Sequence, residues 1–223
     1  MAIEGGDARK LITVLRRRTG DRIEVIDSTV ERFVATIEIV NRSIVAMLSE
    51  KLPTQRESSS FTVTVAQAMP KGQKMDFVVE KLTELGVFAI VPFYCERTIP
   101  QASRREARWQ RLAETAAKQS GRSSVPVVES PLDFESLIER FAGFDCVLFL
   151  WELAEQGPLR ETLPALISAA KSILLIVGPE GGFSSAEAAA AEESGAHLLS
   201  LGTRIVRTET AALVMLAILN YLA

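Results

Sequence analysis

"LLIVGPEGGFSSAE", residues 174–187, is an apolar run that stops at a turn of three glycines, one proline and one glutamate. Ser184 and Glu187 follow at the spacing of a capping box, which indicates the start of a helix. Glycine permits positive φ values and a close approach of the backbone to a ligand. In an open parallel sheet, ligands bind beyond the carboxyl ends of the strands, where such a turn would lie. The stretch predicts either a nucleotide-like cofactor site or a tight strand-to-helix turn.

A second stretch, "LSLGTRIVRTETAAL" at 199–213, repeats this arrangement of strand, loop and helix about 24 residues later. We expect Thr208 to cap the helix and Glu209 to lie in its first turn, where the helix dipole favours a carboxylate. The two loops would then lie side by side, and two arginines and two carboxylates would share one mouth: Arg204, Arg207, Glu180 and Glu209. This combination favours a functional site over a structural turn. A phosphate-binding loop is not expected, because the P-loop and GxGxxG patterns are both missing.

Around these stretches, strand-like and helix-like segments alternate from residue 61 onward, which predicts an α/β domain with a largely parallel sheet. Strands are expected at 61–69, 88–95, 145–151, 172–178 and 197–202, and helices at 72–87, 104–121, 131–143, 163–171, 184–195 and 208–223. Residues 9–48 alternate in the manner of β-structure, with strands expected at 22–26, 32–39 and 43–48. The polar segment 51–60 is the expected linker, so the domains are predicted at 1–55 and 60–223.

The composition fits a globular protein of the cytoplasm. The chain has 223 residues, of which 48% are hydrophobic and 24% charged, and a formal net charge of −3. Two cysteines and one histidine argue against a metal site and against Ser-His-Asp or Cys-His chemistry. The N-terminus has no apolar signal segment, and the apolar stretch at 211–223 is too short to span a bilayer.

Five motifs together carry a resemblance to a known family. "LLIVGPEGGFSSAE" followed by "LGTRIVRTETAA" resembles the RsmE family, the 16S ribosomal RNA uridine-N3 methyltransferases of the SPOUT superfamily. "QAMPKGQKMDFVVEKLTELGV" (67–87), "ERT" (96–98) and "AAKQSGRSSVP" (116–126) look like the other signatures of that family. The motifs occur in the family's order over nearly the whole chain.

The resemblance implies a C-terminal trefoil knot that binds S-adenosylmethionine in a site completed by a homodimer. Three loops would form the pocket: "LWE" at 150–152, Gly178–Gly182 and 201–206. The implied cofactor-binding residues are Leu150, Trp151, Gly178, Pro179, Glu180, Gly181, Gly182, Leu201, Gly202, Arg204, Ile205 and Val206. The family's N-terminal domain is a PUA-like β-barrel that helps to grip RNA. The family usually carries an extra strand before the "VLR" segment at 14–16, and this chain starts almost at that segment, so either the start is trimmed or the barrel lacks its first strand.

The chemistry at uracil N3 suggests three catalytic candidates. N3 carries a proton, so a base or a group that stabilises the uracil anion is needed. Arg207 is our candidate for stabilising negative charge on O2 or O4. Glu209 would either orient Arg207 or accept the proton, and Glu180 is the competing base. Because N3 lies on the Watson–Crick edge, the target uridine must be unpaired or flipped out, which favours a structured ribosomal substrate.

Local basic clusters indicate an RNA partner despite the acidic net charge. Seven basic and two acidic side chains lie between Arg97 and Arg122, and two more clusters occur elsewhere. The candidate RNA-binding residues are Arg16, Arg17, Arg18, Lys71, Lys74, Lys81, Arg97, Arg104, Arg105 and Arg122. Trp109 lies in the same stretch, where core packing is favoured over base stacking. The alternatives left open are a methyltransferase of the same superfamily with another target, a non-catalytic RNA-binding assembly factor, and an unrelated α/β nucleotide-binding enzyme.

Overall fold

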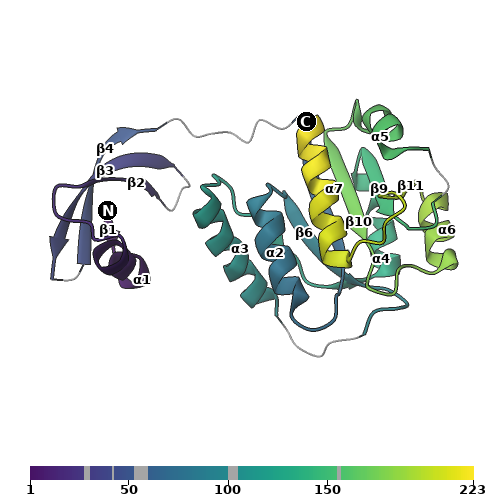
Figure 1. The fold of residues 1–223 in the computed structure, drawn as a ribbon, viewed down its shortest axis with the longest axis horizontal. Helices are drawn as coiled ribbons and strands as arrows, with labels where there is room; N and C mark the ends of the chain where they lie inside the picture. Colours follow the sequence, from purple (N-terminus) through teal and green to yellow (C-terminus); the bar gives the residue numbers. More distant parts are fainter. Residues whose placement is uncertain (28–30, 42, 53–59, 100–104, 155–156) are drawn as a thin grey trace. The chain divides into compact units, whose positions relative to one another are not determined.

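The structure is a computed structural model that divides into two compact units, Met1–Arg56 and Glu57–Ala223 (Figure 1). It describes residues 1–223 except 28–30, 42, 53–59, 100–104 and 155–156. In the described part of the chain, no helix is long and apolar enough to cross a membrane.

The first unit is a four-stranded antiparallel sheet in the order β1-β4-β3-β2. Its elements are β1 (Ala2–Ile3), α1 (Gly5–Arg9), a π-helical segment (Lys10–Val14), β2 (Arg22–Ile26), β3 (Arg32–Val40) and β4 (Ser43–Lys51). Ile37 and Ile44 are fully buried on one side of this sheet, beside Ala8 of α1. The three longer strands confirm the expected ones to within three residues at their ends, and β1 shows that a short strand does precede the "VLR" segment.

The prediction of β-structure from residue 9 is wrong at its start, because residues 5–14 are helical. Ala8 is 1% exposed, and Leu11 and Ile12 pack against the same small core. These three apolar positions are spaced by three and four residues, which is the period of a helix face and not of a strand. The helical period is only one turn long here, so the alternation that follows it dominates the pattern.

The second unit is an α/β domain, and its seven-stranded sheet confirms the predicted parallel arrangement. The order is β11-β9-β10-β5-β6-β7, with β8 also paired to β6, and every pairing is parallel. The strands are β5 (Thr62–Ala68), β6 (Ala89–Tyr94), β7 (Val127–Val128), β8 (Leu132–Asp133), β9 (Cys146–Leu150), β10 (Ser172–Val177) and β11 (His197–Leu199). The helices are α2 (Lys74–Glu84), α3 (Glu106–Ser120), α4 (Phe134–Glu139), α5 (Leu159–Ile167), α6 (Ser185–Glu193) and α7 (Thr208–Leu222), with a 3-10 turn at Phe141–Gly143.

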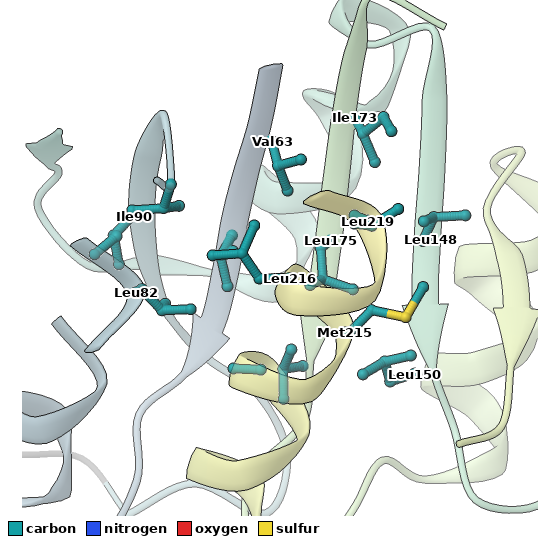
Figure 2. Close-up of a cluster of buried hydrophobic side chains, with 14 of the residues drawn as sticks. Val63, Leu82, Ile90, Leu148, Leu150, Ile173, Leu175, Met215, Leu216 and Leu219 are labelled. Carbon is teal, nitrogen blue, oxygen red and sulfur yellow. The ribbon is translucent and has the colours of Figure 1, made fainter. Parts of the chain in front are cut away.

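Helices cover both faces of this sheet, which is why its central strands are apolar on both sides. In β10, Ile173 and Leu175 face the core beneath α2, α3, α5 and α7, whereas Leu174 and Ile176 face α4 and α6. Figure 2 shows Met215, Leu216 and Leu219 of α7 among strand residues on the first of these faces. This packing fixes the start of α7 over the carboxyl ends of the strands.

Helix α5 begins four residues earlier than the sequence predicted. It spans Leu159–Ile167, with Pro158 at the N-cap position and Pro164 inside the helix. A proline inside a helix removes one backbone hydrogen bond and is normally avoided there. Leu163 and Ile167 are spaced by four residues and are 1% and 5% exposed, so the burial of this apolar face offsets the lost hydrogen bond.

Candidate active site

Three loops meet at the carboxyl edge of the parallel sheet and enclose a cavity of about 920 Å³. They follow β9, β10 and β11, which are the strands that the sequence placed before the three pocket loops. The backbone N–H of Trp151 donates a hydrogen bond to the Leu199 carbonyl at 2.8 Å, which joins the loop after β9 to β11. All twelve of the predicted cofactor-binding residues line this one cavity.

The turn after β10 packs against a cluster of buried aromatic rings. A Cβ atom added at Gly178 would lie 2.9 Å from Cε2 of Phe183. Phe183 is 3% exposed, and its ring centroid lies 4.1 Å from that of Phe149. Gly182 adopts a φ of +67°, a left-handed conformation that favours glycine. The glycines are therefore required by close packing at position 178 and by backbone conformation at position 182.

The predicted capping box at the start of α6 is confirmed. Ser184 Oγ accepts a hydrogen bond from the Glu187 N–H, and the Glu187 carboxylate accepts one from the Ser184 N–H. The other oxygen of Glu187 accepts a hydrogen bond from the Glu96 N–H at 2.8 Å. The cap thus also fixes the segment after β6 beside the glycine turn.

The prediction that Thr208 caps α7 is wrong, because Arg207 occupies the N-cap position and Thr208 begins the helix. Thr208 is 6% exposed, and its hydroxyl donates to the Gly178 carbonyl at 2.5 Å and accepts from Gln67 Nε2 at 2.8 Å. The Thr208 hydroxyl therefore forms hydrogen bonds with Gly178 and Gln67, which are distant in sequence, and not with the N–H groups of its own helix. It holds the start of α7 to the turn after β10.

The two carboxylates proposed as bases both lie against Lys74. Lys74 Nζ is 2.9 Å from Glu180 Oε1 and 3.4 Å from Glu209 Oε2. Glu180 also accepts the Lys71 N–H at 3.1 Å. Burial acts to raise the pKa of Glu180, but the hydrogen bonds from Lys74 and from the Lys71 N–H outweigh it and leave that pKa lowered. The hydrogen bond to Glu180 in turn raises the pKa of Lys74.

The expected convergence of four charged groups is met in part. Glu180, Arg204 and Arg207 line the cavity, and both arginines are exposed. Glu209 is not among the lining residues, and its side chain is 13% exposed. Its ion-pair partner within the described residues is Lys74, not Arg207. Within the described residues, no contact between Glu209 and Arg207 supports the predicted role of Glu209 in orienting Arg207.

The candidate RNA-binding residues fall into two groups in the structure. Arg16–Arg18 and Lys71 are exposed, and Arg105 is half-buried at the start of α3. Several others have partners within the fold: Lys81 Nζ bonds Glu80 and Glu84, Arg97 Nη1 bonds the Gly181 carbonyl, and Arg122 Nη1 bonds the Thr83 and Val87 carbonyls. Arg104 lies outside the described residues.

Trp109 confirms the expectation of core packing. It is 2% exposed, and its indole N–H donates to Asp76 Oδ1 at 3.1 Å. A different tryptophan, Trp151, lines the cavity, and its indole N–H is buried with no hydrogen-bond partner among the described residues. Lys74 also lines the cavity, which helical periodicity could not predict, because it gives no signal for contacts with loops at the carboxyl edge of the sheet.

Comparison with protein families gives the class of protein that this fold and cavity define. A family model described as an RNA methyltransferase domain matches residues 56–220, which is nearly the whole second unit. The crystal structure of ribosomal RNA small subunit methyltransferase E from Neisseria gonorrhoeae, bound to S-adenosyl methionine, matches with a TM-score of 0.84 at 30% identity. That match covers 100% of this chain and 91% of the other.

Similar sequences make the assignment more specific. Ribosomal RNA small subunit methyltransferase E of Bacillus subtilis (strain 168) is 32% identical over 231 residues, which covers 99% of this chain and 89% of the relative. The protein of the same name from Synechocystis is 34% identical, over 94% of this chain and 69% of the relative. The chain therefore belongs to the ribosomal RNA small subunit methyltransferase E family.

Proposed function

We propose that the protein transfers a methyl group from S-adenosylmethionine to N3 of a uridine in 16S ribosomal RNA of the small subunit. The observation that carries the proposal is the cavity at the carboxyl edge of the sheet. It is formed by the glycine turn after β10 and the loops after β9 and β11. The relative from Neisseria gonorrhoeae binds S-adenosyl methionine. The target atom follows from the family resemblance.

The residues around the cavity suit that cofactor. A volume of about 920 Å³ lies within the range of small-molecule sites, and the lining includes apolar side chains such as Leu150, Leu201 and Ile205. The indole N–H of Trp151 is a buried donor without an acceptor among the described residues, which a polar ligand atom would satisfy. Gly178 and Gly182 line the cavity, so backbone without a side chain faces it at these two positions.

The chain's own groups provide positioning and charge. S-adenosylmethionine supplies an activated methyl group on a sulfonium, so the protein needs no covalent catalysis. In the balanced reaction the N3–C bond forms, the C–S bond breaks with its electrons going to sulfur, and the N3 proton passes to a base. We assign Arg207, which lines the cavity, to the stabilisation of negative charge on O2 or O4. Glu209 and Glu180 are the two candidate proton acceptors.

The finer description of the fold belongs to the same proposal. We propose a trefoil knot in the second unit, supported by the return of the chain from the edge strand β11 to pack α7 over the central strands. Thr208 is bonded to Gly178 and Gln67 at the point where this return begins. The four-stranded antiparallel sheet of the first unit supports a PUA-like RNA-binding domain.

We propose a homodimer that acts on RNA in the cytoplasm. Apolar side chains are exposed along α7 and in the loop before it, including Tyr221 at 88% and Ile205 at 98%. Exposed apolar side chains at these positions support the proposed interface between two copies of the chain. For RNA, the exposed side chains of Arg16–Arg18 and Lys71 are the favoured phosphate contacts. Arg97, which follows β6, and Arg105, the N-cap residue of α3, are further candidates.

The proposal is tested by methyl transfer from labelled S-adenosylmethionine. The substrates are small ribosomal subunits that lack the modification and, in parallel, naked 16S RNA, and the labelled nucleotide is mapped. Label on uridine N3, mainly in the assembled subunit, is the expected result. Label on another atom or another RNA would replace the target. No label with intact cofactor binding by calorimetry would refute this substrate, and no cofactor binding would favour the non-catalytic RNA-binding alternative.

The role of Arg207 has its own test. Arg207→Ala is expected to lower turnover while leaving cofactor affinity unchanged, and Arg160→Ala, whose side chain is 83% exposed on α5, is the matched control. Near-wild-type turnover of Arg207→Ala with normal cofactor affinity would remove Arg207 from the mechanism.

A further inference from the structure

Lys74 is the first residue of α2, yet its side chain lines the cavity formed by the loops after β9, β10 and β11. The sequence grouped it with Lys81 as an RNA-phosphate contact along one helix. The two lysines differ in their partners. Lys81 pairs with Glu80 and Glu84 of its own helix, whereas Lys74 pairs with Glu180 and Glu209, more than 100 residues away. Lys74 is therefore part of the site.

We propose, resting on the function proposed above, that Lys74 is a further catalytic residue. Its ammonium donates a hydrogen bond to the uracil carbonyl oxygen that gains negative charge as N3 loses its proton.

The donor count supports this role. A lysine ammonium has three N–H donors and no acceptor. Glu180 Oε1 takes one donor at 2.9 Å, and Glu209 Oε2 lies at 3.4 Å. Even if both carboxylates are served, one donor remains on a group that lines the cavity. An oxygen that develops negative charge is the ligand that this donor suits.

The ammonium is also held in place before any substrate arrives. Glu180 is anchored to the segment before α2, because its two carboxylate oxygens lie 3.1 and 3.4 Å from the Lys71 nitrogen. Glu209 lies in the first turn of α7, and its buried Oε2 accepts no hydrogen bond of normal geometry from the described residues. One anchored carboxylate, that of Glu180, and one largely buried carboxylate, that of Glu209, thus restrain the Lys74 ammonium. A preorganised donor stabilises developing charge without the cost of rearrangement.

The protonation state of Lys74 suits a donor and excludes a proton acceptor. The hydrogen bond to Glu180 raises its pKa above the ordinary value, so the ammonium persists at neutral pH. Arg207, by contrast, is exposed, and no ion pair restrains its guanidinium within the described residues. Lys74 is therefore the restrained positive charge of the cavity, whereas Arg207 would approach O2 or O4 from an exposed position.

The test is the single-turnover rate of methyl transfer to small subunits that lack the modification, with cofactor affinity measured separately by calorimetry. Lys74→Met is expected to lower the rate about 10²–10³-fold, the usual effect of removing one such donor. Its cofactor dissociation constant is expected to change less than about threefold. Lys171→Met is the matched control, because Lys171 is exposed and precedes β10 at the opposite edge of the sheet.

A second pair of variants separates loss of the donor from loss of structure. Glu180→Gln alone and Lys74→Met/Glu180→Gln differ only in the lysine, and neither leaves Glu180 as an unpaired charge. The double variant is expected to be about 10²-fold or more slower than Glu180→Gln. Equal rates for these two variants would overturn the proposal where Glu180→Gln retains measurable turnover; an inactive Glu180→Gln would identify Glu180 as the proton acceptor, and the Lys74→Met rate would then decide.

The remaining outcomes are also decisive. A Lys74→Met rate within threefold of wild type would overturn the proposal, while wild-type methylation of N3 would leave the proposed function standing. A loss confined to cofactor affinity would overturn it as well, because the ammonium would then bind the cofactor's carboxylate. If the wild-type protein methylates no uridine N3, the proposed function fails, and the role of Lys74 fails with it.

Discussion

Gly178→Ala tests whether the floor of the cavity is set by aromatic packing. The added Cβ would lie 2.9 Å from Cε2 and 3.0 Å from Cδ2 of Phe183, whereas carbon atoms in contact normally lie about 3.5–4.0 Å apart. The ring cannot move away easily, because Phe183 is 3% exposed and packs against Phe149, Phe93 and Phe134. Overpacking of this kind costs about 1–3 kcal/mol.

The displaced turn is expected to affect both stability and cofactor binding. The carbonyl of Gly178 accepts the Thr208 hydroxyl, so a shift of the turn also loosens the start of α7. Each 1.4 kcal/mol lost from the free energy of binding lowers the affinity for the cofactor about tenfold. Urea unfolding measures the loss of stability, and calorimetry with S-adenosylmethionine measures the loss of affinity.

Two further variants make the reasoning refutable. At Gly181 an added Cβ would meet the Arg97 side chain at 3.4 Å and nothing closer, so Gly181→Ala is expected to cost less than about 0.5 kcal/mol. On a Phe183→Ala background the clash is gone, and the cost of Gly178→Ala is expected to shrink by about 0.5–3 kcal/mol. If Gly178→Ala costs the same with and without the Phe183 ring, the packing argument is wrong.

Three other predictions follow from the charges and burial of particular groups. Burial raises the pKa of the Cys95 thiol to about 12, so iodoacetamide at pH 8 should label it far more slowly in the native protein than in guanidinium; equal rates would contradict this. The pKa of Glu180 is lowered from 4.5, so its ionised form stabilises the fold above about pH 4.5, and this stabilisation is lost as the pH falls through the lower native pKa. The difference in urea midpoint between wild type and Glu180→Gln should therefore be present at pH 7 and shrink at pH 3, and a constant difference would count against the ion pair. Replacing Arg16–Arg18 by alanine should make the slope of log affinity for RNA against log salt shallower by about 2, for three lost phosphate contacts at 0.7 each on single-stranded RNA; an unchanged slope would remove this cluster from the interface.

Local patterns were enough to predict most of the second unit. Met75, Val78, Val79 and Leu82 of α2 are 0–2% exposed, as their helical spacing predicted, whereas Phe77, which lies off that spacing, is 45% exposed. Gly86 and Gly121 follow α2 and α3 with positive φ values of 89° and 71°. Such elements are specified by residues close together in sequence, so a single sequence carries enough information about them. The same holds for the capping box of α6.

Contacts between distant segments were beyond local patterns. Thr208 was expected to cap its own helix, because a threonine before an apolar run is a common N-cap. Its hydroxyl bonds instead to Gly178 and Gln67, which lie 30 and 141 positions away. A buried hydroxyl takes the best available partners, and those partners exist only after the sheet has brought β5 and β10 together. The helical segment at residues 5–14 was missed for a different reason: its buried apolar positions run only from Ala8 to Ile12, about one turn, which is too short to establish a period.

Lys74 and Lys81 show why contacts between distant segments matter more for the chemistry of the site than local patterns do. Both occur in one amphipathic helix with similar side-chain exposure, 35% and 34%, and the sequence gives no reason to separate them. The carboxylates around Lys81 come from its own helix, so they would pair with it in an isolated helix as well. The carboxylates around Lys74 come from the turn after β10 and the start of α7, so its charge is fixed only when the three segments have folded together. The Lys74 ammonium is therefore held in position only in the folded site. Its ion-pair partners, and not its position along α2, are the reason to assign Lys74 to the reaction.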